Sequence, residues 1–259
     1  MNRTRLANAV PATVAGGRDA ARLIIMGAMF ASCFAAGMPR GIAAVTWGGS
    51  LALTNDYLVR GISRSADRAA LQADLHIVNR FGLIAGLSAS SAQIDPEDRR
   101  DVEIEAFFGL VRDIGSDWRG KVLLSHYAYP WNRYPSQYDY DELDLDAVYR
   151  DWLQFSVIYS PNSPRFVPYR GFINVAAKAA ELNLQLPVRH KIFATGGAGY
   201  ARLGGPDAAG YAYWSIGARC DLAPVTLALS YVDTGSGAKS LFYDAAAGGR
   251  WIGTVLWQF

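Results

Sequence analysis

Residues 142–147 read Glu142-Leu143-Asp144-Leu145-Asp146-Ala147, an unbroken alternation of carboxylates and apolar side chains. Successive side chains of a β-strand point to opposite faces, so this run has one acidic face and one apolar face. The run 101–106 repeats the pattern. The acidic faces of the two runs carry Asp101, Glu103, Glu105, Glu142, Asp144 and Asp146. Such runs indicate a sheet whose two sides meet different surroundings.

The same period of two recurs along most of the chain in runs of about ten residues, which predicts an all-β fold. No segment after residue 44 has the apolar length of a membrane-spanning helix. The phase of the eighth run slips near Lys178, which predicts a bulge or a short helical excursion. Twelve runs are expected as strands, at approximately 48–60, 69–79, 82–93, 100–112, 118–129, 139–149, 152–160, 170–184, 189–202, 211–222, 225–233 and 249–259.

The connections between these runs alternate in length, which is the sidedness of outer-membrane barrels. The tight set lies near 79–82, 112–117, 149–152, 186–188 and 222–224, and the longer, more polar set at 61–68, 95–99, 130–138, 161–169, 203–210 and 234–248. Every proline after residue 44 is expected in a connection or at a strand end, because proline cannot serve a central ladder. With both termini on the short-turn side, the pattern predicts an antiparallel up-and-down β-barrel of about twelve strands.

A soluble sandwich or a lipocalin-like barrel is the competing all-β fold, because 51% hydrophobic and 19% charged residues fit either environment. The apolar rows opposite the acidic ones favour a lipid-facing exterior around a polar lumen. Tyr and Trp residues gather beside the connections, as aromatic rings do at membrane interfaces, although cross-strand packing in hairpins would also place them there. We therefore expect a transmembrane barrel.

The last run, residues 250–259, supports this expectation. Trp251, Val255, Trp257 and Phe259 share one face, and the chain stops on the aromatic residue Phe259. A terminal Phe on an alternating strand resembles the signal that the bacterial barrel-assembly machinery recognises. Trp257 and Phe259 are therefore predicted to act in assembly, with that machinery as a partner.

The first 44 residues have the parts of a secretory signal peptide. Arginines precede an apolar stretch at 23–38, which is short for a bilayer-spanning helix, and a small-residue run ends at Ala44. We expect cleavage near Ala44; an uncleaved anchor and a lipidated Cys33 are the alternatives. The chain is then divided into a removed signal peptide, 1–44, and an outer-membrane barrel, 45–259.

Removal of residues 1–44 takes away five of the 25 basic residues and one of the 23 acidic residues, which leaves 20 and 22. The remaining chain is weakly acidic, so no nucleic-acid partner is expected. Cys220 is then its sole cysteine, which excludes an internal disulfide.

The first half of the barrel sequence resembles the TorF-type porins, a proteobacterial family of outer-membrane proteins. The likeness covers roughly residues 48–160 and otherwise extends only to the strand rhythm and the terminal Phe. The loop at 131–139 is longer than the family pattern. The resemblance implies a barrel and passive transport, and it carries no catalytic residues. The matching stretches are 53–63, 70–74, 82–90, 102–105 with Phe108-Gly109, 126–130 and 140–142.

The function expected is that of a porin, which passes small polar solutes passively or selectively through a charged lumen. Strand spacing and a tilt near 40° give twelve strands a backbone radius of about 12 Å, which large inward side chains would narrow or block. The charged rows could form structural ion pairs or select solutes, and both readings stay open. Besides the six carboxylates, the lumen candidates are Arg119 and Lys121 on the fifth run, and Arg60, Lys178 and Arg219 elsewhere.

Three alternatives compete with a porin function. An outer-membrane lipid hydrolase would need a serine and a base on one face, whereas Ser125 and His126 are adjacent on a strand and face opposite sides. Three scattered histidines have no metal-ligand spacing, and no cofactor is expected. A structural or adhesive barrel without a channel is the third alternative. The partners expected are the lipid bilayer, lipopolysaccharide and small polar solutes.

Overall fold

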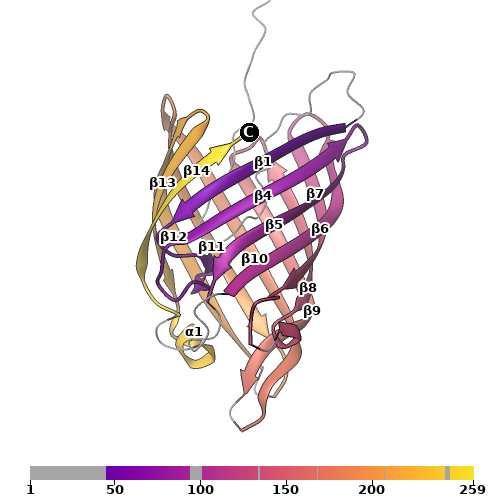
Figure 1. Ribbon diagram of the computed structural model, residues 1–259. Helices are drawn as coiled ribbons and strands as arrows, with labels where there is room; N and C mark the ends of the chain where they lie inside the picture. Colours follow the sequence, from indigo (N-terminus) through magenta and orange to yellow (C-terminus); the bar gives the residue numbers. More distant parts are fainter. Residues whose placement is uncertain (1–44, 94–100, 134, 168, 207, 243–245) are drawn as a thin grey trace, which may run out of the picture.

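The computed structural model describes residues 45–259 except 94–100, 134, 168, 207 and 243–245. The predicted signal peptide, 1–44, lies outside the described residues. Twelve long antiparallel strands close into one barrel (Figure 1). They are β1 (Val45–Thr54), β4 (Ala70–Asn79), β5 (Leu83–Ala92), β6 (Asp101–Ile114), β7 (Trp118–Ala128), β8 (Tyr140–Tyr149), β9 (Leu153–Val167), β10 (Gly171–Arg189), β11 (Ile192–Leu203), β12 (Ala209–Leu222), β13 (Val225–Thr234) and β14 (Arg250–Gln258).

The barrel closes where the first and last strands meet. β1 pairs with β14 from Ser50 opposite Gln258 to Thr54 opposite Thr254, and its other edge pairs with β4. All other long strands pair with their neighbours in the chain, so the order around the wall follows the sequence. The predicted antiparallel up-and-down barrel of about twelve strands is confirmed.

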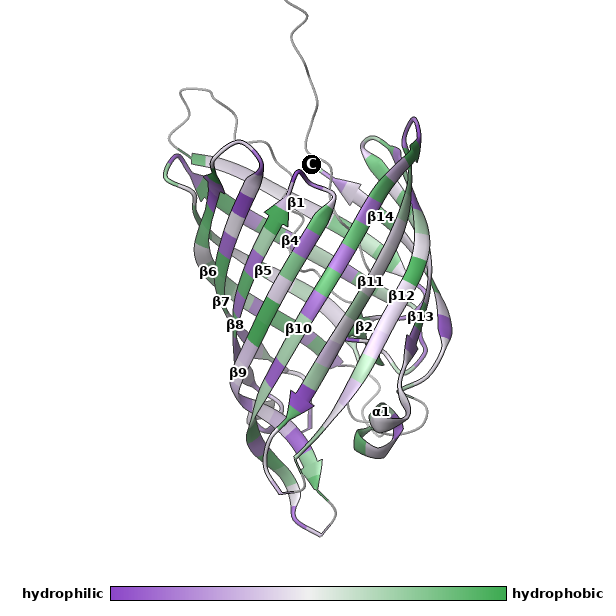
Figure 2. Ribbon diagram, turned by 180° about the vertical axis from the view of Figure 1, so that it is seen from behind, coloured by the Kyte–Doolittle hydropathy of each residue, from purple (hydrophilic) through white to green (hydrophobic). Residues whose placement is uncertain are grey.

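Each wall strand has an inner polar face and an outer apolar face. On β8, Glu142 and Asp146 are buried inside the barrel, whereas Leu145 between them is 43% exposed on the outside. Figure 2 shows hydrophobic and hydrophilic residues alternating along the strands. The alternation read from the sequence therefore corresponds to the two sides of the wall.

The two ends of the barrel differ. One end, here the turn end, has the short connections 80–82, 115–117, 150–152, 190–191 and 223–224, together with both ends of the sheet. The opposite end, here the loop end, has the connections 55–69, 93–100, 129–139, 204–208 and 235–249, and it carries the short helix α1 (Ser236–Leu241). The predicted sidedness is confirmed. None of the helices in the described part of the chain has the length and apolar character needed to cross a membrane.

The first strand is shorter than predicted. It ends at Thr54 and not near Arg60, and residues 55–69 leave the wall. Within this segment β2 (Leu58–Val59) and β3 (Ile62–Ser63) form a small antiparallel hairpin. The alternation of Tyr57 and Val59 with Asp56 and Arg60 continues the strand pattern, which is why sequence periodicity extended the strand too far.

The connection expected at 161–169 is also different. β9 continues to Val167, and β10 begins at Gly171, so the two strands form a long hairpin that projects at the loop end (Figure 1). Pro161 and Pro164 lie within β9, and Pro187 lies within β10, which contradicts their expected exclusion from strands. Each lies beyond the last paired residue on one side: β8 pairing stops at Tyr159, and β9 pairing with β10 stops at Leu184. On an unpaired edge no hydrogen bond between strands is lost when proline has no N–H to donate.

The irregularity expected near Lys178 is a bulge and not a helical excursion. The β9–β10 register shifts between Val175 and Ala177. After this shift Lys178 is exposed on the outer face, whereas Ala179 is buried. Lys178 is therefore not a lumen residue, and its assignment as a lumen candidate is wrong.

The C-terminal residue extends the closure of the barrel. The Gly49 N–H donates to the Phe259 carbonyl oxygen at 3.0 Å, and the Phe259 N–H donates to the Gly49 carbonyl oxygen at 3.1 Å. The Trp257 and Phe259 rings are exposed on the outer face, with centroids 4.9 Å apart. The predicted outward row is present, and its role in assembly stays a prediction.

Candidate functional site

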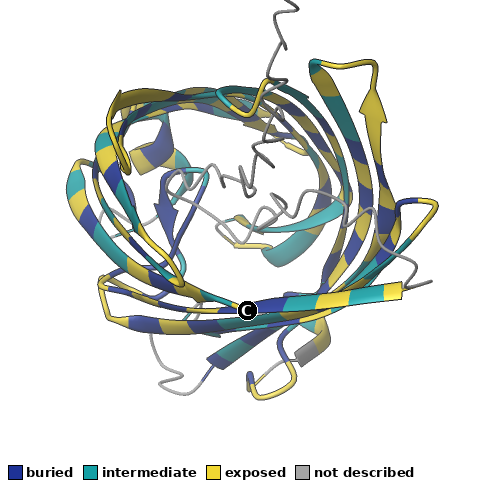
Figure 3. Ribbon diagram, turned by 90° about the horizontal axis from the view of Figure 1, so that it is seen from above, coloured by how far each residue is buried: buried dark blue, intermediate teal, exposed yellow. Residues whose placement is uncertain are grey.

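The connection between β1 and β4 crosses the lumen. We call residues 55–69, which include β2 and β3, the inner hairpin. Its Leu58 packs against Val232 of β13 and Ile252 of β14, whereas its Arg60 forms an ion pair with Glu142 of β8. β14 and β8 lie on opposite sides of the twelve-strand ring, which Figure 3 shows from above. The contacts of Leu58 and Arg60 therefore make the inner hairpin span from wall to wall. The lumen is therefore bridged near its loop end.

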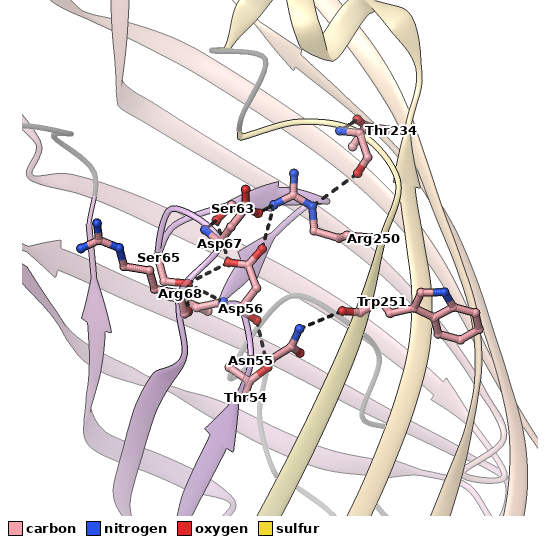
Figure 4. Close-up of polar contacts among 12 residues, drawn as sticks. Thr54, Asn55, Asp56, Ser63, Ser65, Asp67, Arg68, Thr234, Arg250 and Trp251 are labelled. Carbon is pink, nitrogen blue, oxygen red and sulfur yellow. Dashed lines mark hydrogen bonds and ion pairs between the residues drawn. The ribbon is translucent and has the colours of Figure 1, made fainter.

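Asp56 holds the start of the inner hairpin in shape. Its carboxylate accepts hydrogen bonds from the hydroxyls of Ser63 at 2.6 Å and Ser65 at 2.8 Å, and it forms an ion pair with Arg250 of β14 at 2.8 Å (Figure 4). Arg250 also pairs with Asp67. Hydrogen bonds to a charged group contribute about 1.5–3 kcal/mol each. This cluster therefore fixes the hairpin to the closing strand of the barrel.

The acidic row of β6 holds the hairpin and the β7–β8 connection. Glu103 accepts hydrogen bonds from the hydroxyls of Tyr57, at 2.6 Å, and Tyr129. Asp101 accepts one from the side-chain amide of Asn132 at 2.9 Å. Both carboxylates and the three side chains bound to them are buried, so this part of the row is committed to positioning loops.

Glu105, one step closer to the turn end, is bound by the wall itself. It accepts hydrogen bonds from the Ser88 hydroxyl of β5 at 2.9 Å and from the Ser125 hydroxyl of β7 at 2.7 Å. Because these strands flank β6, their hydroxyls satisfy this carboxylate within the barrel wall.

The acidic row of β8 combines paired and unpaired carboxylates. Glu142 pairs with Arg60, and Asp146 pairs with Lys121 of β7, its direct cross-strand neighbour. Asp144, between them, is half-buried and makes no hydrogen bond or ion pair with another described residue. The row therefore supplies both anchors and a carboxylate open to the lumen.

Large inward side chains lie flat against the wall where a glycine faces them on the neighbouring strand. The Tyr213 ring covers Gly199, so a Cβ there would meet its hydroxyl at 2.5 Å, and the hydroxyl donates to Glu181 at 2.6 Å. The Phe107 ring covers Gly86 in the same way, and the His76 ring covers Gly48. At these three positions the glycine lets the ring lie against the wall.

The remaining predicted lumen residues divide between the lumen and its rim. Arg219 is buried on the inner face of β12, with its guanidinium 2.9 Å from Asp221 and 4.7 Å from the Phe193 ring. Arg119 faces inward near the turn end, where it pairs with Asp113 at 2.9 Å. Among the predicted cations, Arg60 and Lys121 pair with carboxylates of the β8 row, so the structure brings together only part of the predicted set.

Several residues of the site were not singled out from the sequence. Asp56, Tyr57, Glu181 and Arg250 join strands that are far apart in the chain. The one local signal was the polar, serine-rich segment after Arg60, which indicated a loop but not its direction. The inner hairpin folds into the lumen because of contacts with residues up to 194 positions away in the sequence. Local periodicity cannot predict such contacts.

The hydrolase alternative gains no support from the geometry. Ser125 is buried and donates to Glu105 inside the barrel, whereas His126 is exposed outside and bonded to Asp141 at 2.8 Å. A pocket of about 410 Å³ lies beside His126 and is also lined by Ser125, but the Ser125 hydroxyl is bonded to Glu105. Among the described residues no group of His, Cys, Asp and Glu could hold a metal ion.

Comparison with known proteins gives a family and a set of similar barrels. The family model described as "Bacterial protein of unknown function (Gcw_chp)" matches residues 40–258. No curated protein matches the chain. At 6–13% identity, the likeness to solved structures concerns the fold alone.

Three of these structures are representative. A chain from work titled "Unveiling the Mechanism Behind the in-meso Crystallization of Membrane Proteins" has a TM-score of 0.53 at 9% identity, over 83% of each chain. The KdgM porin has a TM-score of 0.48 at 10% identity, over 82% of this chain and 99% of its own. The COG4313 outer membrane channel from Pseudomonas putida F1 has a TM-score of 0.48 at 12% identity, over 86% of this chain and 97% of its own.

Proposed function

This chain belongs to the Gcw_chp family of bacterial proteins, and we propose that it is an outer-membrane porin that passes small polar solutes past the inner hairpin. The proposal includes an outer-membrane location with the loop end outside the cell. It also takes the resemblance of residues 48–160 to the TorF-type porins as a shared function.

The arrangement of the inner wall carries this proposal. A barrel that served only as a scaffold could fill its centre with large side chains, as small barrels do. Here Phe107, His76 and Tyr213 lie over glycines of the adjoining strands. The inward faces of β11 and β13 carry mainly small residues, among them Thr195, Gly197, Ala228 and Ser230. This wall supports a water-filled path beside the hairpin.

The charges along the path support a preference for cations. Six carboxylates face inward on β6 and β8. Arg60 and Lys121 pair with two of them, and Arg64 interacts electrostatically with Glu103. Carboxylate rings favour cations in channels. Asp144 supplies the carboxylate most open to a passing ion.

Single-channel recording in planar bilayers tests the proposal on the refolded barrel. We expect stable conductance steps and a reversal potential, under a salt gradient, that shows cation preference. Asp144→Asn should reduce that preference without changing the number of channels. Asp141→Asn removes an outward carboxylate three residues away and is the matched control. A folded barrel that never conducts would refute the porin proposal.

The inner hairpin favours a second candidate, a structural barrel without a channel. Its Leu58 packs against β14 and its Arg60 pairs with Glu142 of β8, and these wall-to-wall contacts could seal the lumen completely. The same recordings separate the two functions, because a sealed barrel would conduct only after the hairpin is released.

A further inference from the structure

Two cations face each other on the outer surface of the barrel. Lys178 of β10 and Arg202 of β11 are direct cross-strand partners, and both are exposed. Like charges directly opposite each other destabilise a strand pair. Charged side chains on a lipid-facing surface are also unfavourable, more so toward the middle of the bilayer. This pair therefore needs a compensating group.

The described residues do not supply that group. No carboxylate among them forms an ion pair with Lys178 or Arg202. Lys178 makes a cation–π contact, in which its Nζ lies 5.9 Å from the centroid of the Tyr159 ring. An anion that compensates the two charges would therefore come from outside the described residues.

The pair lies near the loop end of the wall. Arg202 is the next-to-last residue of β11 and precedes the connection 204–208. Tyr159 and Tyr200 are exposed on the same outer surface beside the two cations. Tyrosines gather at membrane interfaces because their rings are amphipathic. In the proposed outer-membrane location, these positions place the pair at the level of the lipid headgroups.

We propose that Lys178 and Arg202 bind a phosphate group of lipopolysaccharide, the phosphorylated glycolipid of the outer leaflet. Arginine presents a planar fork that matches phosphate geometry, and lysine adds a point charge from the neighbouring strand. A phosphate between them would convert a repulsive pair into a bridge between β10 and β11. This inference rests on the proposed outer-membrane location and is independent of channel activity.

The test measures, by native mass spectrometry, how much glycolipid binds to the refolded protein and to its variants in detergent. The probes are lipopolysaccharide and the same material after enzymatic dephosphorylation. We expect Lys178→Gln with Arg202→Gln to weaken lipopolysaccharide binding by about tenfold or more, as loss of two charge-assisted contacts would. The unmodified protein should lose its binding to a similar extent when the phosphates are removed.

The matched control is Arg112→Gln with Lys191→Gln, which removes two exposed cations near the turn end. It should retain binding within about twofold. The single variants Lys178→Gln and Arg202→Gln should each give an intermediate loss, and they serve if the double variant does not fold. Equal binding by the double variant, or equal binding of dephosphorylated glycolipid, would overturn the proposal. So would a dimer that forms without glycolipid and disappears in the double variant, because a second copy would then occupy the site.

Discussion

Arg60 of the inner hairpin forms an ion pair with Glu142 of β8, inside the barrel and across the lumen from the hairpin's contacts with β14. Their side chains are 12% and 1% exposed. A buried pair adds little stability over an apolar replacement, but loss of one partner leaves an uncompensated charge at a cost of about 3–5 kcal/mol. The pair is therefore suited to hold the hairpin in one position and to release it when broken.

We predict that Arg60→Gln raises single-channel conductance or the fraction of time that the channel is open. The variant leaves Glu142 buried without its cation, and the cost is relieved if the hairpin moves and water enters. Recordings on the refolded variant and on the unmodified barrel measure the change.

The charge-swapped variant, Arg60→Glu with Glu142→Arg, is the control for that prediction. It retains a pair of opposite charges and should restore the original conductance. Conductance that stays the same in Arg60→Gln would show that the hairpin does not limit the path.

Gly199→Ala should narrow the lumen. An added Cβ would lie 2.4–2.6 Å from the Tyr213 ring and hydroxyl, so the ring must leave the wall and its hydrogen bond to Glu181 must break. We expect lower conductance and a loss of stability of about 1–3 kcal/mol, typical of overpacking.

Gly196→Ala is the matched control for that substitution. It lies three residues earlier on β11, where the nearest atom to an added Cβ is a backbone oxygen at 3.9 Å. It should leave conductance unchanged. If Gly199→Ala conducts as well as Gly196→Ala, the flat packing of Tyr213 does not keep the path open.

Sequence periodicity predicted most of the wall, because the pattern of two is a direct consequence of one apolar and one polar side. The side chains of residues 142–147 and 101–106 point to the expected faces, and each of the twelve predicted runs begins within three residues of the start of an observed strand. The prediction was wrong at Tyr57 and Val59, where the alternation continues although the chain has left the barrel wall. It was also wrong at Lys178, where a bulge changes which side chains face inward.

The candidate site was only partly predictable for a different reason. The sequence indicated which carboxylates face inward, since orientation is local. It did not indicate that Glu103 and Glu142 hold Tyr57 and Arg60, because those contacts depend on a loop folding back over 46 and 82 positions. Charge rows thus predicted the lumen, and the structure showed that many of the charges anchor a hairpin.

At the turn end, Arg150→Gln should make Asp117 titrate closer to the ordinary range of a carboxyl group. The Arg150 guanidinium donates to Asp117 at 2.8 Å and lowers the pKa of that carboxyl. A lowered pKa in the folded state stabilises the fold above the pKa of the unfolded chain, and this contribution is lost as pH falls through the folded value. NMR titration of Asp117 in the refolded barrel measures the shift, and an unchanged titration curve would contradict the role of Arg150.

Deletion of Phe259 should impair assembly in cells more than stability in detergent. Phe259 makes two backbone hydrogen bonds with Gly49 of β1, and its ring lies 6.0 Å from that of Trp47 on the outer surface. Net hydrogen-bond contributions are about 0.5–1.5 kcal/mol each, so loss of the residue should not by itself unfold a purified barrel. If the assembly machinery recognises the Phe259 side chain, as predicted, its loss would lower the yield of heat-modifiable barrel in the outer membrane far more strongly. Gln258→Ala, which alters an inward neighbour, should leave that yield unchanged; an equal loss in both variants would indicate a structural role for this end of β14 and not a recognition signal.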